Sequence, residues 1–412
     1  MIKEKHSHID ADEDQKRYLD IEKKYQTENR PLNITLTVLF FAFIYVFALL
    51  FWILPDKDIS AEENRALASA PKFTTEALAD GTYTSEFATY MADQFPARNF
   101  FVGLKAFSEK VLLKGENNGV IFARDGYLVK RFDNVDEDVL NKNISDISAF
   151  AKAAKEGGID VTVAVAGREV DVAASILPVS YGTDSSDKTW SVIDSAFADN
   201  GTEYVDLKTP LKEHFDAGEY VYYKTDHHWT SLGAYYAYGI LSEKMGDDAE
   251  ELGSFNRETV TASFYGTIWS SAGAKWIDPD SIEFFRYDGD EDLVTDRGDE
   301  TFDGLYKTSF LEEKDKYSAF LGGNAARIDV TSKSGEREKL LVIKDSFFHS
   351  LAPFFAKDYD LVIIDMRYYN ESVSKLCLDE NIKKVLILFN AETIGEESGL
   401  GRLRMYLDPF GE

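Results

Sequence analysis

Three short apolar runs most strongly limit what the carboxyl-terminal part of this chain can fold into. They are residues 339–343, 360–364 and 384–389. Nearly continuous apolar runs of this length are typical of strands buried on both faces, as in a parallel sheet with helices on either side. Residues 159–166 form a further strand pattern, and segments with helical periodicity alternate with the strands at 139–156, 187–199 and 231–245. The pattern predicts an α/β domain with a central, mostly parallel sheet.

Two polar blocks, more than a hundred residues apart, contain the side chains of a nucleophilic site. Ser346 follows the first of these apolar runs, so it would lie at the carboxyl end of a strand and in the first turn of a helix. Asp226 and His228 are two residues apart and would share one side of a loop or strand, with His227 pointing away. Asp226 could then orient His228, which would accept the proton of Ser346. The spacing predicts a Ser-His-Asp triad if the blocks meet in space.

Further residues near these blocks are candidates for the same site. The Asn324 amide and the Ser346 backbone N–H could hold an oxyanion, and Gly323 would let a substrate approach the backbone closely. Trp229 is a candidate sugar-stacking platform, although a core position fits it equally well. His349 lies three residues after Ser346 and is a rival base or a substrate contact.

Structural interpretations of the same residues remain open. Ser346 alone suits a helix cap, and His228 suits a packed, hydrogen-bonded position. Asp226 with His227 and His228 could also bind a metal, but metal ligands usually recur elsewhere, and His214 and His349 are the only other histidines outside the first 33 residues. We therefore expect no metal and no cofactor.

An uncharged apolar stretch near the amino terminus predicts a membrane helix. Residues 34–54 carry no charge and are long enough to cross a bilayer. Because 33 residues precede it, an anchor fits better than a signal peptide. Seven Lys/Arg residues lie before it and only Lys57 lies close after it, which predicts a cytoplasmic amino terminus.

Charge and cysteine content exclude several classes of partner and fold. Nearly all of the net charge of −28 would face outward. Such a domain is a poor partner for nucleic acid or anionic lipid, and for polyanionic glycans unless it has a local basic groove. Cys377 is the only cysteine, so there is no disulfide framework.

The expected organisation has a tail, an anchor and an outer domain. We expect a cytoplasmic tail at 1–33, the anchor at 34–54, a linker and helical region at 55–115, and the α/β domain at 116–412. Residues 250–335 are polar and aromatic-rich with weak periodicity. They suit either an insertion or a set of antiparallel strands.

Taken together, these blocks resemble the DHHW family, whose name spells residues 226–229. The resemblance covers most of residues 58–410 and rests on eight further matches: 63–65, 93–98, 118–120, 125–128, 224–238, 320–324, 343–347 and 365–369. That family looks related to SGNH-like domains of alginate O-acetylation proteins, which act outside the cytoplasmic membrane beside a multispanning membrane-bound O-acyltransferase. The resemblance implies a flavodoxin-like three-layer fold, with Asp226, His228 and Ser346 at the triad positions.

Two departures from the SGNH pattern limit what can be transferred. Lys344 stands where the usual nucleophile block has glycine, and residues 166–169 replace the Pro-Thr-like loop expected after the first sheet strand. Substrate contacts of that loop are therefore not carried over.

The sequence favours a membrane-anchored acyl- or O-acetyltransferase, or an esterase, that acts on a cell-surface glycan. The alternative is a non-catalytic glycan-binding or assembly component of a polysaccharide modification system. A metal-dependent hydrolase is a third interpretation, and it predicts loss of activity with a chelator.

Overall fold

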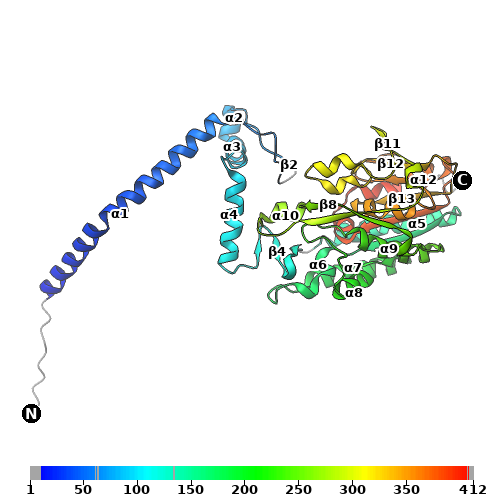
Figure 1. Ribbon diagram of the computed structural model, residues 1–412, viewed down its shortest axis with the longest axis horizontal. Coiled ribbons are helices and arrows are strands. Elements are labelled where there is room, and N and C mark those ends of the chain that lie inside the picture. Colours follow the sequence, from blue (N-terminus) through cyan, green and yellow to red (C-terminus); the bar gives the residue numbers. More distant parts are fainter. Residues whose placement is uncertain (1–10, 61, 63–64, 133–134, 406, 408–412) are drawn as a thin grey trace, which may run out of the picture. The chain divides into compact units, whose positions relative to one another are not determined.

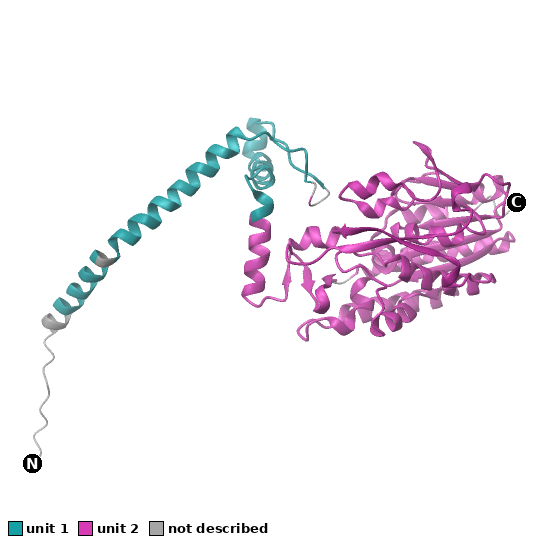
Figure 2. Cartoon of the chain, viewed as in Figure 1, with its two compact units in different colours: residues 1–60, 65–100 teal, residues 61–64, 101–412 magenta. Residues whose placement is uncertain are grey.

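The computed structural model describes residues 11–60, 62, 65–132, 135–405 and 407 (Figure 1). Residue contacts divide the chain into two compact units (Figure 2). The first contains residues 1–60 and 65–100, and the second contains residues 61–64 and 101–412.

A long amino-terminal helix dominates the first unit. Helix α1 spans Ala11–Ile53, and its Asn29–Ile53 segment has a mean hydropathy of 2.6 with none of its apolar window buried. This segment is long and apolar enough to cross a membrane, as a signal sequence or as an anchor. The helix begins well before the predicted anchor, because residues 11–30 are rich in Glu, Lys and Gln, which favour helix formation.

The rest of the first unit is held by family-motif residues. It contains strands β1 (Ile59–Ser60) and β2 (Arg65–Ala66), and helices α2 (Thr75–Ala79) and α3 (Thr82–Asp93). Arg65 Nη1 donates to Asp93 Oδ2 at 2.9 Å, and the Ala68 N–H donates to the same oxygen at 2.9 Å. Of the family motif at 63–65, residues 63 and 64 lie outside the described residues. Helix α4 (Arg98–Val111) follows.

A mixed, mostly parallel sheet forms the centre of the second unit. Among the described residues its eight strands run in the order β11-β10-β12-β14-β13-β15-β6-β7. Strands β14, β13, β15, β6 and β7 are parallel, whereas β12, β10 and β11 join by antiparallel pairing. In chain order the strands are β6 (Asp160–Ala166), β7 (Val205–Asp206), β10 (Leu293–Asp296), β11 (Thr301–Asp303), β12 (Arg327–Ser332), β13 (Lys339–Lys344), β14 (Asp360–Ile364) and β15 (Lys384–Asn390).

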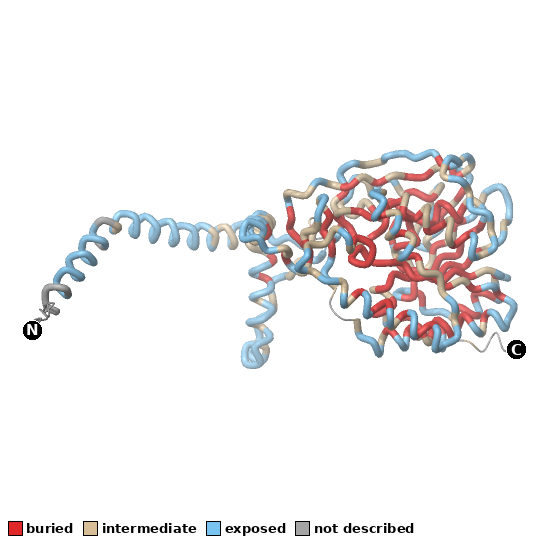
Figure 3. The backbone as a smooth tube through the Cα atoms, turned by 90° about the horizontal axis from the view of Figure 1, so that it is seen from below, coloured by how far each residue is buried: buried red, intermediate tan, exposed pale blue. Residues whose placement is uncertain are grey.

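Alternate residues of each strand face two separate apolar layers. In β13, Leu340 and Val342 join one core cluster, and Leu341 and Ile343 join the other. Helices α5 (Glu137–Glu156), α7 (Asp184–Asp199) and α12 (Val373–Asp379) supply the second cluster, and α8 (Lys208–Asp216), α9 (Ser231–Met245) and α11 (Ala352–Phe355) supply the first. The buried residues accordingly concentrate inside this unit (Figure 3). The predicted three-layer α/β fold is confirmed.

Smaller elements surround this sheet. Residues 250–335 contain the antiparallel pair β8 (Asn256–Phe264) and β9 (Asp280–Arg286), in addition to β10, β11 and β12. The remaining elements are β3 (Glu116–Asn117), β4 (Val120–Phe122), β5 (Leu128–Lys130), α6 (Glu169–Val172), α10 (Thr267–Ala272), α13 (Ala391–Glu396) and α14 (Arg402–Met405), with short 3-10 turns between them.

The segment after β13 differs from the single helix expected there. Residues Ser346–Ser350 form a 3-10 turn, and α11 begins only at Ala352. Asp345 caps this turn, because its Oδ1 accepts from the Phe347 N–H at 3.0 Å. Its Oδ2 accepts from the Asn390 N–H at the end of β15, at 2.6 Å. Ser346 is thereby fixed at the carboxyl edge of the parallel strands, where α/β proteins bind ligands.

Candidate active site

The loop before α9 is folded tightly by its own backbone. The Tyr223 N–H donates to the His228 carbonyl at 3.2 Å, and the Thr230 N–H donates to the Val221 carbonyl at 2.9 Å. Thr230 caps α9 by accepting from the Gly233 N–H at 3.2 Å, as its sequence position predicts. Residues 224–229 are therefore held as a loop, the conformation in which an Asp-x-His spacing brings both side chains together.

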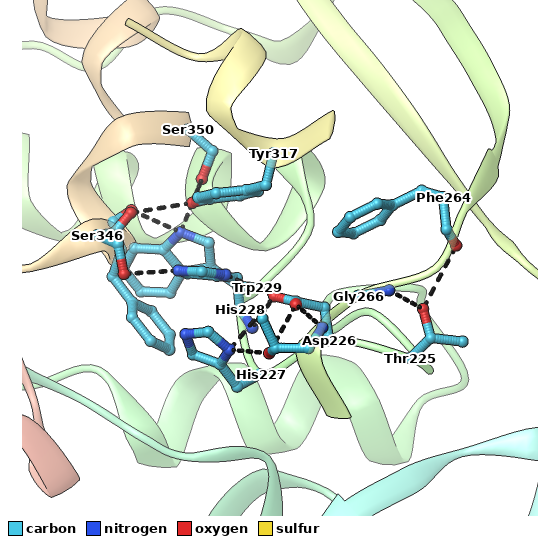
Figure 4. A network of polar contacts seen from close by, with 12 residues as sticks. Thr225, Asp226, His227, His228, Trp229, Phe264, Gly266, Tyr317, Ser346 and Ser350 are labelled. Atoms are coloured by element: carbon cyan, nitrogen blue, oxygen red, sulfur yellow. Dashed lines mark hydrogen bonds and ion pairs between the residues drawn. The ribbon is translucent and has the colours of Figure 1, made fainter. Parts of the chain in front are cut away.

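The structure brings Asp226, His228 and Ser346 into one hydrogen-bonded chain (Figure 4). Asp226 Oδ1 lies 2.5 Å from His228 Nδ1, and His228 Nε2 lies 2.7 Å from Ser346 Oγ. Asp226 and His228 are buried, at 2% and 5% exposure, whereas Ser346 is partly exposed. This order of groups can move a proton from a hydroxyl to an imidazole that a carboxylate orients.

The electrostatic surroundings keep the imidazole neutral and the carboxylate ionised. Burial, together with the neighbouring His227, lowers the pKa of His228 to about 4, although Asp226 opposes the shift. Burial alone would raise the pKa of Asp226, but the adjacent imidazoles and hydrogen bonds from His228 and Thr267 outweigh it and lower that pKa. At neutral pH His228 is therefore free to accept a proton.

Helix α10 supports the second carboxylate oxygen. Thr267 donates to Asp226 Oδ2 from its N–H at 2.8 Å and from its Oγ1 at 3.1 Å. Gly266 lies against Asp226 so closely that a Cβ at position 266 would overlap the carboxylate. Asp280 fixes the preceding residue, because it accepts from the Thr225 N–H at 2.8 Å. The carboxylate is thus held from both sides.

His227 contacts α10, and its ring lies beside that of His228 with centroids 3.8 Å apart. Its Nδ1 lies 2.9 Å from Thr267 Oγ1, and its side chain is 36% exposed. Ligand atoms of Asp226, His227 and His228 lie within 4.8 Å of one another, which is close enough for a metal ion. Both ring nitrogens of His228 already have hydrogen-bond partners, however, so this donor set suits a proton relay better than metal ligation.

Two aromatic residues support the serine turn. Tyr317 stacks on the His228 ring with centroids 3.9 Å apart, and its hydroxyl donates to the Ser346 carbonyl at 3.1 Å. Trp229 Nε1 donates to the Phe347 carbonyl and to Ser350 Oγ, both at 3.0 Å. Trp229 is completely buried, so the proposed role as a substrate contact is wrong. Its indole holds the backbone of the turn instead.

His349 lies in a buried charged cluster behind the serine. Its Nε2 is 2.9 Å from Lys344 Nζ, and its exposure is 1%. The predictions that His349 contacts substrate or acts as a rival base are therefore wrong. Lys344 Nζ also lies 3.2 Å from Asp365 Oδ2 and 3.2 Å from Asn324 Oδ1. Lys344, which replaces the usual glycine, thus connects the serine strand to the Asn324 turn.

Arg297 fixes the turn that carries Gly323 and Asn324. Its Nη1 donates to the carbonyls of residues 321, 322 and 323 at 3.1, 2.6 and 2.9 Å, and its Nη2 donates to that of Asn324 at 3.3 Å. Residues 321–323 all have positive φ values, of 58°, 75° and 84°. This backbone conformation favours glycine, which is present at positions 322 and 323.

Two residues of this turn were predicted to contribute to the site. The Gly323 N–H donates to the Phe320 carbonyl and the Gly323 carbonyl accepts from Arg297, and the substrate contact at Gly323 stays a prediction. Asn324 is exposed, and its Oδ1 accepts from Lys344, which leaves its amide NH2 group to donate elsewhere. Its oxyanion role stays a prediction.

Sequence reasoning missed several residues that build this site. Tyr317, Thr267, Asp280 and Arg297 all lie in residues 250–335, where weak periodicity gave no strand or helix to place them on. One signal was available in the sequence. The two consecutive glycines at 322–323 predict a turn whose backbone carbonyls need hydrogen-bond donors, and Arg297 is such a donor.

The fold is an α/β domain with a central, mostly parallel sheet, and the site is a Ser-His-Asp arrangement at the carboxyl edge of that sheet. The model of the DHHW protein family matches residues 209–365, a range that contains Asp226, His228 and Ser346. The predicted resemblance to the DHHW family is confirmed.

Two solved structures show the same fold at low identity, and a third is similar with a lower TM-score. A DHHW family protein from Eubacterium siraeum is 22% identical, with a TM-score of 0.58, and the match covers 70% of this chain and 95% of that one. Bacillus cereus PatB1 with a sulfonyl adduct is 15% identical, with a TM-score of 0.56, over 68% of this chain and 96% of that one. The O-acetyltransferase domain of Pseudomonas putida AlgJ is 15% identical, with a TM-score of 0.46, and the match covers 69% of this chain and 98% of that one. No curated protein matches the chain.

Proposed function

We propose that this protein is a membrane-anchored, extracytoplasmic acyl- or O-acetyltransferase, or an esterase, that acts on a cell-surface glycan. The observation that carries the proposal is the 2.7 Å approach of His228 Nε2 to Ser346 Oγ, continued by Asp226. The partly exposed serine and the buried, neutral imidazole suit a nucleophile and its base.

The mechanism proceeds in two balanced steps. Ser346 Oγ attacks the acyl carbonyl while its proton passes to His228, and the leaving group departs with that proton. A sugar hydroxyl then attacks the acyl-serine, His228 takes the hydroxyl proton, and this proton returns to Ser346 as the ester bond breaks. Water in place of the sugar would make the protein an esterase.

The proposed oxyanion site consists of the Ser346 N–H and the Asn324 amide. Among the described residues no acceptor is assigned to the Ser346 N–H, so it is available to a developing negative charge. Lys344 Nζ donates to Asn324 Oδ1, which orients the amide and leaves its NH2 group free to donate.

The membrane and glycan parts of the proposal have separate support. The Asn29–Ile53 segment is apolar enough to anchor the chain, and the basic residues before it favour a cytoplasmic amino terminus. The family resemblance suggests the glycan acceptor and a multispanning O-acyltransferase as partner. PatB1, which shares the fold, carries a sulfonyl adduct, and sulfonyl reagents modify reactive nucleophiles.

Trapping the acyl-enzyme tests the proposal. Full-length protein in detergent is incubated with an activated acetyl ester, quenched in acid and mapped by mass spectrometry. We expect acetyl on Ser346, no adduct in Ser346→Ala, and unchanged labelling in Ser195→Ala, which removes an exposed helix hydroxyl. Undiminished ester turnover by Ser346→Ala would refute the proposal and favour the non-catalytic alternative.

A further inference from the structure

A cavity lies beside the loop that carries Asp226 and His228. Its volume is about 680 Å³, within the range of small-molecule sites. Four chain segments line it, namely residues 125–127, 176, 215–224 and 276–281. Asp226, His228 and Ser346 are not among the lining residues. The cavity is therefore distinct from the candidate active site, although it shares the loop at Lys224.

Two of the carboxylates in this cavity are available to a ligand. Asp125 and Asp278 are exposed, and neither side chain has a hydrogen bond or ion pair among the described residues. Asp280 and Glu219 are already occupied. Asp280 accepts from the Lys224 and Thr225 N–H groups at 3.0 and 2.8 Å, and Glu219 lies 3.0 Å from His214 Nδ1.

The cavity carries net negative charge. Its only basic lining residue is Lys224, whose ammonium donates to the Asp125 carbonyl at 2.8 Å. A lining with four carboxylates and one ammonium group disfavours binding of a uronate or phosphate polymer by charge repulsion, and it favours a neutral or cationic ligand.

Aromatic rings form the remaining walls. Tyr127 packs edge-on against Phe215, with centroids 5.2 Å apart, and Tyr220 and Trp276 are partly exposed. Flat aromatic faces suit the C–H face of a sugar ring, and their negative potential attracts cations. Lysine ammonium groups already lie over two of these rings, with Lys224 5.2 Å from the Tyr127 centroid and Lys110 4.6 Å from that of Trp276.

We propose that this cavity binds an amino-sugar unit with a free ammonium group. The ammonium pairs with Asp125 and Asp278, and the sugar ring packs on Tyr220 and displaces the Lys110 ammonium from the face of Trp276. The assignment to a glycan rests on the proposed function. Asp280 contacts both the cavity and Thr225, the residue before Asp226, so a chain held here is anchored beside the candidate active site.

The test measures binding without turnover. Full-length Ser346→Ala protein in detergent is titrated by calorimetry with a glucosamine oligomer, an N-acetylglucosamine oligomer of equal length and an oligogalacturonate, below the pKa of the sugar amine. We expect the glucosamine oligomer to bind most tightly, the N-acetylated oligomer more weakly and the oligogalacturonate not at all.

Variants locate the binding. Asp125→Asn with Asp278→Asn removes two partly exposed charge pairs, which should weaken glucosamine-oligomer binding roughly tenfold and leave N-acetylated-oligomer binding unchanged. Trp276→Leu should weaken both. Asp199→Asn, which removes an exposed carboxylate outside the cavity, should change neither.

Three results would overturn the inference: no oligomer binds, the oligogalacturonate binds as tightly as the glucosamine oligomer, or the double variant binds like its parent. Because the serine is absent throughout, acetyl trapping on wild-type Ser346 decides the proposed function separately.

Discussion

The buried cluster around Lys344 predicts an asymmetry between its two charged partners. Lys344 and Asp365 are each at 1% exposure, and Lys344 Nζ lies 3.2 Å from Asp365 Oδ2. Asp365 is also bound by Arg367, whose Nε and Nη2 donate at 2.9 and 2.6 Å. The carboxylate therefore has a second cation, whereas Lys344 has no second carboxylate within ion-pair distance among the described residues.

Removing either charge should have very different costs. Asp365→Asn leaves the Lys344 ammonium buried without a counter-charge, which should cost about 3–5 kcal/mol of unfolding free energy. Lys344→Met leaves Asp365 paired with Arg367 and also removes a buried charge. Its cost is then confined to the hydrogen bonds with Asn324 and His349, about 1–2 kcal/mol.

Thermal unfolding of the full-length protein in detergent measures the difference. Asp365→Asn should lower Tm by roughly 5–10 °C and Lys344→Met by only a few degrees. Lys339→Met, on the same strand, removes a half-exposed ion pair with Glu380 at 2.9 Å and should cost less than about 1 kcal/mol. A larger Tm loss for Lys344→Met than for Asp365→Asn would show that Arg367 alone does not compensate the charge of Asp365, and would refute this reasoning.

Three further outcomes concern the relay and the turn beside it. Because the pKa of His228 is about 4 and the base must be unprotonated, kcat/KM with an activated acetyl ester should stay level as the pH falls from 7 to about 5. If a pH–rate profile showed kcat/KM reduced to half near pH 6.5, the low pKa of His228 would be contradicted. Asp226→Asn should keep the fold by circular dichroism but lower kcat by roughly three to four orders of magnitude, and a loss below tenfold would argue against a relay. Arg297→Lys should lower kcat about tenfold with little change in KM, because an ammonium group cannot donate to four carbonyls at once. A tenfold rise in KM would instead indicate a role in substrate binding.

The sheet could be predicted because its strands carry a strong local signal. Residues 339–343, 360–364 and 384–389 are apolar on both faces, and the structure buries alternate residues in two different layers. The spacing of Asp226 and His228 and the strand-end position of Ser346 likewise identified the candidate triad residues, whereas their meeting in space was a condition of that prediction that only the family resemblance implied. These features depend on a few consecutive residues, which a single sequence displays directly.

The surroundings of the site could not be predicted in the same way. Trp229 and His349 have side chains that suit either a core or a binding surface, and only the packed structure shows that both are buried. The Arg297 clamp joins a strand end to a turn more than twenty residues later, in a stretch with no clear period. Such contacts depend on tertiary packing, which hydrophobic spacing does not encode.

The close packing of Gly266 against Asp226 has a consequence for judging relatives of this chain. One added methyl group at that position would displace the carboxylate while leaving every letter of the Asp-His-His-Trp signature unchanged. A homologue could thus keep its diagnostic tetrad and its architecture yet be inert as a catalyst. Sorting active from inactive homologues therefore requires inspection of this neighbouring glycine as well as the signature.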